Sequence, residues 1–315
     1  MRAMVIADFG GPEVFEQRDV ERPEPGPGEV LVRVVASGTN PVDAKIRAGA
    51  IPVVEPPAVI GYDVSGVVEE AGPGVDDLRP GDEVYFTPEI FGNPHGSYAE
   101  YVVAPASIVA LKPAGLSHVE AAAVPLAGGT AYEALIRRLE VRPGETVLIH
   151  GGAGGVGSFA VQIAKAAGAY VIATAGPSNQ ETLGELGADV AVDYRSQDFS
   201  EAALQETGGE GVDAVFDAVG GQLVRSLEAT RPFGRLASIL PIQGDLTHAY
   251  LNNQTIYGVF LTRERRRLEE LTRLIEQGKM LPLVDEVLPL EHVSRAHERL
   301  DSGHGRGKVV LEVSG

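Results

Sequence analysis

Residues 147–176, which read VLIHGGAGGVGSFAVQIAKAAGAYVIATAG, constrain the fold more than any other stretch of the chain. Five glycines lie within the seven residues from Gly151 to Gly157. The apolar run before them predicts a strand, and the apolar spacing within Gly155–Gly168 predicts a helix. Glycines at such a turn let the backbone approach a pyrophosphate, which the free N–H groups of the helix N-terminus attract. The stretch therefore predicts a dinucleotide-binding turn, with tight strand–helix packing as the alternative.

Apolar strands alternate with helical patterns through the middle of the chain. The expected strands are Thr146–Gly151, Tyr170–Ala175, Val190–Asp193, Val212–Ala218, Arg235–Leu240 and Thr255–Leu261. This alternation predicts a parallel sheet with helices on both faces. It also favours the binding interpretation of the glycine turn over the packing alternative.

The two ends of the chain follow other patterns. Short apolar runs in the first part are separated by turns such as Pro25–Gly28 and Arg79–Asp82, which is typical of a small barrel or sandwich. The last part predicts a long helix at about Arg263–Gln277 and short strands at Val284–Leu288 and Lys308–Val313. The expected fold class is α/β, with a β-rich domain beside a doubly wound parallel sheet.

Composition narrows the possible partners. The 315 residues suffice for two domains, and the net charge of −18 argues against binding to a nucleic-acid backbone. The absence of cysteine excludes disulfides, thiolate nucleophiles and metal sites built on sulfur. No apolar run approaches the roughly 20 residues that a membrane span requires, and no signal peptide is recognisable. We therefore expect a cytoplasmic protein without a membrane partner.

The segment from Gly144 to Gly157, continuing to Gln162 and Lys165, resembles the quinone oxidoreductase/zeta-crystallin family. This is a zinc-independent branch of the medium-chain dehydrogenases/reductases. The stretches GPGEVLVRV, SGTNPVDAKIRAG, GYDVSGVV, PLAGGTAYEAL and GRGKVVLEV are similar to family counterparts in the same order, so the resemblance covers the whole chain. It implies a GroES-like catalytic domain at residues 1–124 and a Rossmann cofactor-binding domain at 125–262. Residues 263–315 would return to the catalytic domain, and the nicotinamide would lie between the domains.

The resemblance also identifies which residues stand at the positions of the zinc ligands. Zinc alcohol dehydrogenases of the superfamily hold catalytic zinc with two cysteines and a histidine. Here Asn40 stands near the first cysteine position, and Gly61-Tyr62-Asp63 replaces the usual Gly-His-Glu motif. The lobe that carries structural zinc is missing from the sequence. We therefore expect an enzyme without a bound metal.

Without a Lewis acid, a C=C bond conjugated to a carbonyl accepts hydride more easily than a simple ketone. The site then needs hydrogen-bond donors for the charge that develops on the oxygen. Tyr62 and Asn40 are the catalytic residues we expect. Tyr62 could instead only pack in the wall of the site. Asn40 could instead hold a cofactor ribose or, before Pro41, form a turn.

The end of the second expected strand indicates NADPH rather than NADH. NAD-selective domains usually place an acidic residue there to bind a ribose hydroxyl. Here the strand ends Thr174-Ala175-Gly176, and the first acidic residue is Glu181. Ser178 and, by resemblance, Tyr194 would contact the 2′-phosphate, with Arg195 and Lys308 nearby. Gln180 stands where many relatives have a lysine, which would weaken the preference.

The resemblance extends the cofactor site beyond the turn. The residues expected to bind the cofactor are Asn40, Thr130, Gly151, Gly154, Gly155, Val156, Gly157, Thr174, Ser178, Tyr194, Val219, Ile239, Phe260, Leu261 and Lys308. Thr130 could instead be a helix cap. A homodimer is also implied, through edge pairing of the strand near Thr255–Leu261.

Three functions remain open at this point. The first is an NADPH-dependent reductase of quinones or α,β-unsaturated ketones. The second is an enoyl reductase acting on longer acyl or polyketide chains. The third is a non-catalytic, crystallin-like protein that keeps the cofactor fold, and the complete glycine signature disfavours it.

Overall fold

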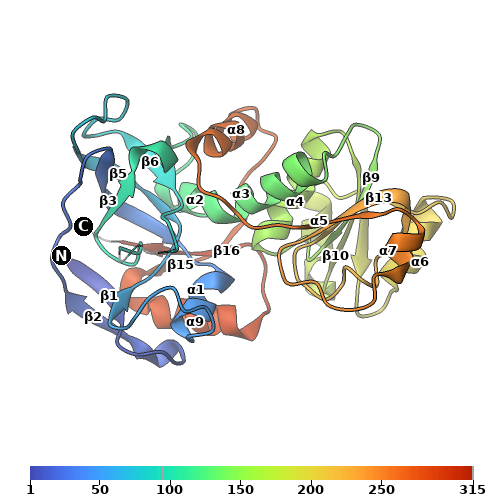
Figure 1. Ribbon diagram of the computed structural model, residues 1–315, viewed down its shortest axis with the longest axis horizontal. Coiled ribbons are helices and arrows are strands. Elements are labelled where there is room, and N and C mark those ends of the chain that lie inside the picture. The colour runs from blue at the N-terminus through green and yellow to red at the C-terminus, as the bar shows by residue number, and fades with distance from the viewer. Residues whose placement is uncertain (92, 94, 314–315) are drawn as a thin grey trace. The chain divides into compact units, whose positions relative to one another are not determined.

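The computed structural model describes residues 1–91, 93 and 95–313 (Figure 1). Its chain divides into two compact units. The first unit contains Met1–Ala127, Thr262–Glu276 and the described chain from Pro282 onward. The second unit contains Gly128–Leu261 and Gln277–Leu281.

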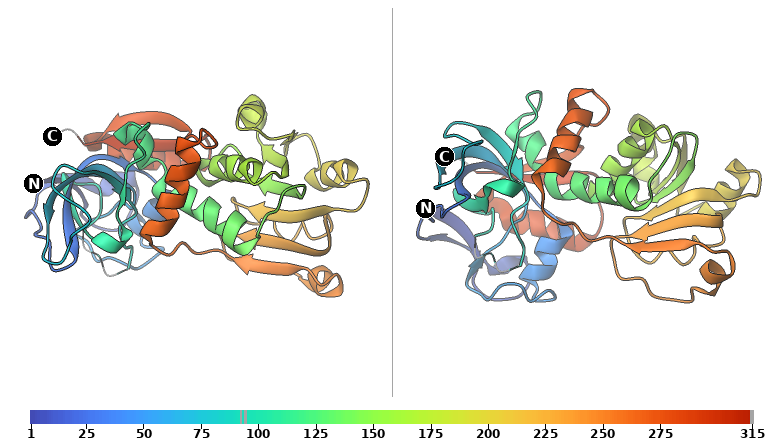
Figure 2. Two further views of the ribbon diagram at one scale, coloured as in Figure 1. Left: turned by 90° about the horizontal axis from the view of Figure 1, so that it is seen from above. Right: turned by 45° about the horizontal axis from the view of Figure 1, so that its top comes forward.

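The second unit is built on a six-stranded parallel sheet. Its strands are β9 (Thr146–His150), β10 (Tyr170–Ala175), β11 (Val190–Asp193), β12 (Val212–Asp217), β13 (Thr230–Ser238) and β14 (Thr255–Gly258). They are ordered β11-β10-β9-β12-β13-β14, and every neighbouring pair is parallel. In chain order this is the 3-2-1-4-5-6 arrangement of a dinucleotide-binding Rossmann fold, so the expected sheet is confirmed. Figure 2 shows the orange strands β13 and β14 toward one edge of this sheet.

The expected strands differ from the observed ones mainly at their ends. β14 ends at Gly258 rather than Leu261, and β13 begins at Thr230 rather than Arg235. The extra residues of β13 include Pro232, and its pairing with β12 is irregular between Val212 and Ala214. Proline is disfavoured inside strands, so the sequence pattern predicted the start of β13 after Pro232 rather than before it.

Helices cover both faces of this sheet. They are α3 (Pro125–Tyr132), the π-helical segment η3 (Glu133–Arg138), α4 (Gly155–Ala166), η4 (Pro177–Asn179), α5 (Gln180–Glu185), α6 (Phe199–Glu206) and α7 (Thr247–Leu251). On one face, Leu148, Ile172 and Val215 pack against Phe199 of α6 and Ala249 of α7. Figure 1 shows α6 and α7 near each other in this unit. The consecutive residues Val147, Leu148 and Ile149 of β9 are all fully buried, so both faces of this strand are covered, which explains its continuous apolar run.

The first unit contains two antiparallel-rich sheets. Its strands are β1 (Arg2–Ile6), β2 (Phe15–Asp19), β3 (Glu29–Gly38), β4 (Ala58–Val59), β5 (Val64–Ala71), β6 (Glu83–Phe86), β7 (Tyr101–Pro105), β8 (Ala110–Leu111), β15 (Val284–Pro289) and β16 (Lys308–Glu312). One sheet has the order β2-β1-β4. The other has the order β15-β16-β3-β5-β6-β8, with β7 also pairing with β3. β16, near the C-terminus, therefore pairs with β3, so this sheet combines strands from the first and last parts of the chain.

Helices and turns complete the first unit. They are η1 (Pro12–Val14), α1 (Pro41–Arg47), η2 (Ala106–Ile108), α2 (His118–Ala122), α8 (Arg265–Glu276), η5 (Leu290–His292) and α9 (Val293–Ser302). Tyr85 of β6 donates a 2.6 Å hydrogen bond to the carbonyl of Leu268 in α8, so this returning helix is tied to the β-rich sheet. Across residues 1–91, 93 and 95–313, every helix is too short or too polar to span a bilayer.

Candidate functional site

The glycine turn lies between β9 and α4, as expected. Gly151 has a φ of +70°, a left-handed conformation that favours glycine. Its backbone N–H faces Thr174 Oγ1 at 3.2 Å, and the N–H of Gly152 bonds the carbonyl of Thr174 at 2.9 Å. Gly154 is the N-cap of α4 and has extended φ and ψ angles. The turn is therefore held against β10, and the N-terminus of a 12-residue helix follows it.

Gly157 is where this turn tolerates no side chain. A Cβ atom there would lie 2.0 Å from the carbonyl oxygen of Gly151 and 2.9 Å from the Cα of Gly152. All of these contacts are to backbone, which cannot rotate away. Glycine at this position lets the first turn of α4 pack against the loop. The N-terminus of α4 offers unpaired N–H groups and the positive end of the helix dipole beside glycine backbone. A pyrophosphate binds to such a site, so these residues fit the expected cofactor.

Six of the expected cofactor residues share one topological position. Gly151, Ser178, Tyr194, Val219, Ile239 and Phe260 each follow the carboxyl end of a different strand of the parallel sheet. Ligands of open α/β sheets bind outside that end of the strands. The sheet thus brings together at one edge residues that are up to 109 positions apart in the chain.

The end of β10 gathers the residues expected to read the 2′ position of the ribose. A Cβ atom on Gly176 would lie 3.6 Å from the Tyr194 hydroxyl, so this hydroxyl is beside the turn after β10. Ser178 is exposed in η4, and the Tyr194 side chain is 53% exposed. Gln180 is turned inward, where Nε2 donates to the carbonyls of Ala175 and Gly176. It therefore stabilises the turn and does not present its amide to a phosphate.

Sequence reasoning missed Asp217, which shapes another loop of this edge. Its buried carboxylate at the end of β12 accepts four backbone N–H groups, from Val219, Gly220, Gln222 and Leu223. The loop places Val219 against the glycine turn, because a Cβ atom on Gly151 would lie 2.3 Å from Val219 Cγ1. An aspartate at the end of an apolar strand, followed by Gly220-Gly221, was the available signal.

Three expected cofactor residues do not follow the carboxyl end of a strand of this sheet. Thr130 is buried inside α3, so it does not cap that helix. Asn40 and Lys308 belong to the first unit, where both are buried. They are members of a set that we call the buried polar cluster. Its members are Asn40, Asp43, Tyr62, Asp63, Tyr98, His297 and Lys308.

Asn40 is the N-cap of α1, with Pro41 at the first helical position. The Asn-Pro pair therefore starts a helix and does not form an isolated turn. Its side-chain amide is held on both sides. Nδ2 donates to Asp63 Oδ2 at 2.9 Å, and Oδ1 accepts from Lys308 Nζ. Asn40 is thus oriented by two charged neighbours.

Lys308 begins β16, and all three of its ammonium hydrogens have acceptors inside the first unit. Nζ lies 2.6 Å from the carbonyl of Thr39 and 3.2 Å from Asp63 Oδ2, and it donates to Asn40 Oδ1. Lysine has three donors, so none is left for a cofactor phosphate. The geometry favours a role for Lys308 in orienting Asn40 and neutralising Asp63.

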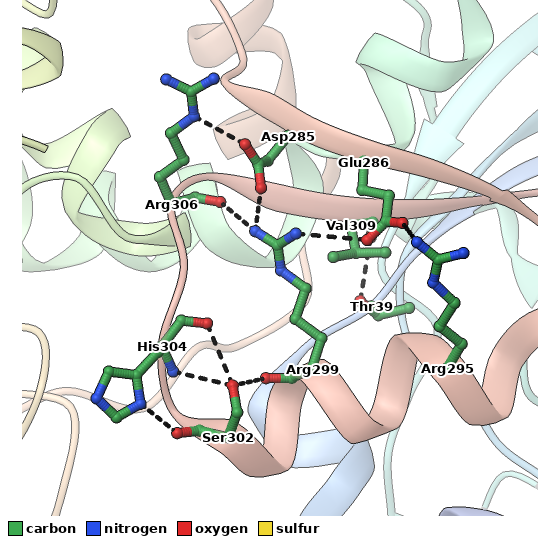
Figure 3. Close-up of polar contacts among 9 residues, drawn as sticks. All are labelled: Thr39, Asp285, Glu286, Arg295, Arg299, Ser302, His304, Arg306 and Val309. Carbon is green, nitrogen blue, oxygen red and sulfur yellow. Dashed lines mark hydrogen bonds and ion pairs between the residues drawn. The ribbon is translucent and has the colours of Figure 1, made fainter. Parts of the chain in front are cut away.

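Ion pairs fix the loop that leads into Lys308 (Figure 3). Arg306 and Arg299 both bind the carboxylate of Asp285, and Arg299 also pairs with Glu286 at 3.4 Å. Beyond the loop, Thr39 Oγ1 donates to the carbonyl of Val309 at 3.0 Å. These contacts join α9, β15 and β16, so Lys308 enters the cluster at a defined position.

The hydroxyl of Tyr62 is buried without a hydrogen-bond partner among the described residues, and the side chain is only 1% exposed. Burial raises the pKa of Tyr62 above its ordinary value, the charge of Asp43 adds to this rise, and Arg263 opposes it. A buried polar atom without a partner is rare in native proteins and calls for an explanation. The hydroxyl therefore stays protonated, and no described group accepts its hydrogen.

The described residues contain no group of three or more His, Cys, Asp or Glu side chains that could hold a metal ion. Tyr62 stands at the position of the zinc-ligating histidine in the expected alignment, and its phenol has an elevated pKa. That the enzyme binds no metal stays a prediction, to be checked by elemental analysis of the purified protein.

Comparison with known proteins identifies the family. The family "Alcohol dehydrogenase GroES-like domain" matches residues 26–114, and "Zinc-binding dehydrogenase" matches residues 186–311. The chloroplastic NADPH-dependent alkenal/one oxidoreductase of Arabidopsis thaliana is 35% identical, over 99% of this chain and 79% of its own length. The quinone oxidoreductase of Pseudomonas aeruginosa is 35% identical, over 97% of this chain and 98% of its own.

This chain belongs to the quinone oxidoreductase family of medium-chain dehydrogenases/reductases. The fold agrees: a solved structure described as an NAD-dependent alcohol dehydrogenase is 39% identical, with a TM-score of 0.93 over 100% of both chains. The resemblance, the GroES-like and Rossmann architecture and the assignment as an oxidoreductase are thereby confirmed. The matched family is described as "Zinc-binding dehydrogenase", although this chain has no cysteine that could bind zinc.

Proposed function

We propose that this protein reduces quinones or α,β-unsaturated ketones with NADPH. The observation that carries the proposal is the unpartnered, buried hydroxyl of Tyr62. When bound, the nicotinamide supplies a hydride. The protein's own task is then to stabilise the negative charge that develops on the substrate oxygen, and a buried phenol in its neutral form is a suitable donor. The names of both curated relatives agree with this substrate class.

The two units divide the task in this proposal. The edge of the second unit beyond the strand ends binds the dinucleotide, with the pyrophosphate at Gly154–Gly157. The first unit provides Tyr62 and Asn40 for the substrate. This assigns catalysis to residues 1–124 and 263–315 and cofactor binding to residues 125–262. The alternatives, an enoyl reductase for long acyl chains and a non-catalytic protein, are not favoured by the names of the relatives.

The first test is the product formed from 2-cyclohexenone. We expect the saturated ketone, because a donor at the carbonyl oxygen stabilises the enolate that results from hydride addition to carbon. Replacing Tyr62 by Phe should lower kcat about tenfold, or about 1.4 kcal/mol, because the ring stays and the donor is lost. Chromatography of the products decides the first point, and the allylic alcohol as main product would contradict it. An unchanged kcat and KM in Tyr62→Phe would leave Tyr62 a packing role only.

The second test concerns the choice of cofactor. We infer a preference for NADPH, because the turn after β10 presents Ser178 and the Tyr194 hydroxyl and no carboxylate. We expect kcat/KM for NADPH to exceed that for NADH by about tenfold, a modest ratio because Gln180 supplies no charge. Tyr194→Phe should weaken NADPH more than NADH. Equal values for the two cofactors, or a preference for NADH as the name of one structural relative suggests, would refute the assignment.

We also propose a homodimer that forms through β14. This strand is an edge of the parallel sheet, and its outer side has no partner strand among the described residues. Large apolar side chains near it are exposed, with Tyr250 at 83% and Phe233 at 70%. Exposed edges that carry apolar residues are typical of strand addition between subunits. A monomer in light scattering would exclude this dimer. The expected cytoplasmic location stays a prediction.

A further inference from the structure

His150 is the last residue of β9 and comes immediately before the glycine turn. Its side chain is buried, and both ring nitrogens have hydrogen-bond partners within the second unit. Nε2 lies 2.8 Å from Ser226 Oγ, and Nδ1 lies 3.4 Å from Thr174 Oγ1. The ring therefore connects the chain that follows β12 with the end of β10, beside the turn.

Ser226 decides which ring nitrogen carries the hydrogen. Its Oγ lies 2.8 Å from the carbonyl oxygen of Gln222, which can only accept, so the hydroxyl hydrogen is used there. Ser226 Oγ then accepts from His150 Nε2, which carries the hydrogen. Burial lowers the pKa of His150 below its ordinary value, while Asp217 opposes this effect and Arg225 adds to it. The ring is thus neutral, and Nδ1 keeps a lone pair that can accept.

The segment that contains Ser226 is itself fixed in place. Asp217 accepts the backbone N–H of Gln222 at 2.9 Å, and the backbone N–H of Ser226 bonds the carbonyl of Gln222 at 3.0 Å. The ring of Phe199 packs edge-on against the ring of His150, with centroids 4.6 Å apart and planes at 78°. These contacts hold the imidazole in one orientation.

Thr174 connects the ring to the glycine turn. Its Oγ1 accepts the N–H of Gly151 at 3.2 Å, and its carbonyl accepts the N–H of Gly152 at 2.9 Å. The hydroxyl hydrogen of Thr174 is then available to Nδ1 of His150. Thr174 is buried, so its hydroxyl would turn toward another acceptor if Nδ1 were absent. The N–H of Gly151 would then lose its partner.

We infer that His150 is a positioning residue for the cofactor: by accepting the Thr174 hydrogen, it holds Gly151 in the conformation that the dinucleotide requires. The inference rests on the proposed binding of NADPH at this turn. His150 acts through Thr174 and is not a catalytic residue. Loss of its acceptor should raise KM for NADPH and leave kcat at saturating NADPH unchanged. A lower kcat with an unchanged KM would contradict this role.

Two substitutions test the two ring nitrogens separately. His150→Asn places an amide oxygen near the position of Nδ1 and keeps an acceptor for Thr174. His150→Gln places an amide nitrogen near the position of Nε2 and keeps a donor for Ser226. In fluorescence titrations, the Kd for NADPH should rise about tenfold in His150→Gln and less than about threefold in His150→Asn. Asparagine leaves the larger cavity, so a residue that only packs would show the opposite order, and that order would overturn the inference.

Thr174→Val keeps the shape of the side chain and should also raise the Kd for NADPH about tenfold. Because His150 acts through Thr174, adding His150→Gln to Thr174→Val should weaken binding no further. Additive effects, or an unchanged Kd in Thr174→Val, would overturn the inference.

Thr207→Val is the matched control for the threonine substitution. Thr207 is the C-cap of α6 in the same unit. Its Oγ1 also accepts a glycine N–H, from Gly211 at 3.0 Å, and donates to the carbonyl of Ala203 at 2.8 Å. Thr207→Val should therefore lose as much thermal stability as Thr174→Val and bind NADPH like the wild type. Equal weakening of NADPH in the two variants would mean that Thr174 acts only through stability, which would overturn the inference.

Nitrogen-15 NMR of histidine-labelled protein observes the ring without turnover. At about pH 6, the signals that disappear in His150→Gln should be those of a neutral ring with its hydrogen on Nε2. A charged ring, or a hydrogen on Nδ1, would overturn the inference. A wild type that binds NADPH, shows the expected order of variants and reduces neither enones nor quinones would support the inference and overturn the proposed function. A wild type that does not bind NADPH would overturn both.

Discussion

Gly157→Ala should weaken NADPH binding about 100-fold, or about 2.7 kcal/mol, and lower the stability of the second unit by about 1–3 kcal/mol. The new Cβ would lie 2.0 Å from the carbonyl oxygen of Gly151, so the loop and the first turn of α4 must separate. Separation removes the close approach of backbone on which pyrophosphate binding depends. Fluorescence titration with NADPH and thermal unfolding measure the two effects.

Gly184→Ala is the matched control for this substitution. Gly184 lies in α5 of the same unit, and a Cβ atom there would meet nothing within 4 Å. Alanine is the better helix former, so this variant should be as stable as the wild type or up to about 1 kcal/mol more stable, with unchanged NADPH affinity. If Gly157→Ala bound NADPH as tightly as Gly184→Ala does, the assignment of the turn would be wrong.

Lys308→Met should lower the free energy of unfolding by about 3–5 kcal/mol, because it leaves the buried carboxylate of Asp63 without its cation. Burial already raises the pKa of Asp63, and loss of Lys308 removes a charge that lowers it. Asp63 in the folded variant then holds its proton to higher pH than in the unfolded chain, so stability falls as pH rises. Urea unfolding at about pH 6 and about pH 9 should show the larger loss at the higher pH.

Two further variants isolate the buried pair. Asp63→Asn/Lys308→Met removes both charges, so it should be more stable than Lys308→Met alone. Lys165→Met breaks a half-exposed pair with Asp189, whose atoms are 2.7 Å apart, and should cost about 1 kcal/mol or less. A loss of that size in Lys308→Met would mean that the cluster tolerates an unpaired Asp63.

The sequence alone predicted the parallel sheet of the second unit and its glycine turn, apart from strand ends such as the start of β13. Strands such as Tyr170–Ala175 and Val190–Asp193 have the bounds that their apolar runs predict. The physical reason is locality, because strand, glycine turn and helix lie within about 30 consecutive residues of one βαβ unit. The residues that follow each strand then come together as a consequence of parallel topology.

The sequence also identified Asn40 and Tyr62 as residues of interest, but it could not assign their partners. Asn40 is bonded to Lys308, which is 268 positions away, and Tyr98 meets His297 across 199 positions. Local propensity contains no information about such contacts.

Only the tertiary structure showed that Lys308 turns inward and that Asp43 Oδ1 and Tyr62 Oη are buried without partners. The ionisation of Asp43 and Tyr62 depends on burial and on charges from distant segments, such as Lys308 of β16 for Asp43 and Arg263 for Tyr62. A linear pattern of residues can name the groups that carry the chemistry. Their protonation is decided by which other groups the fold places around them.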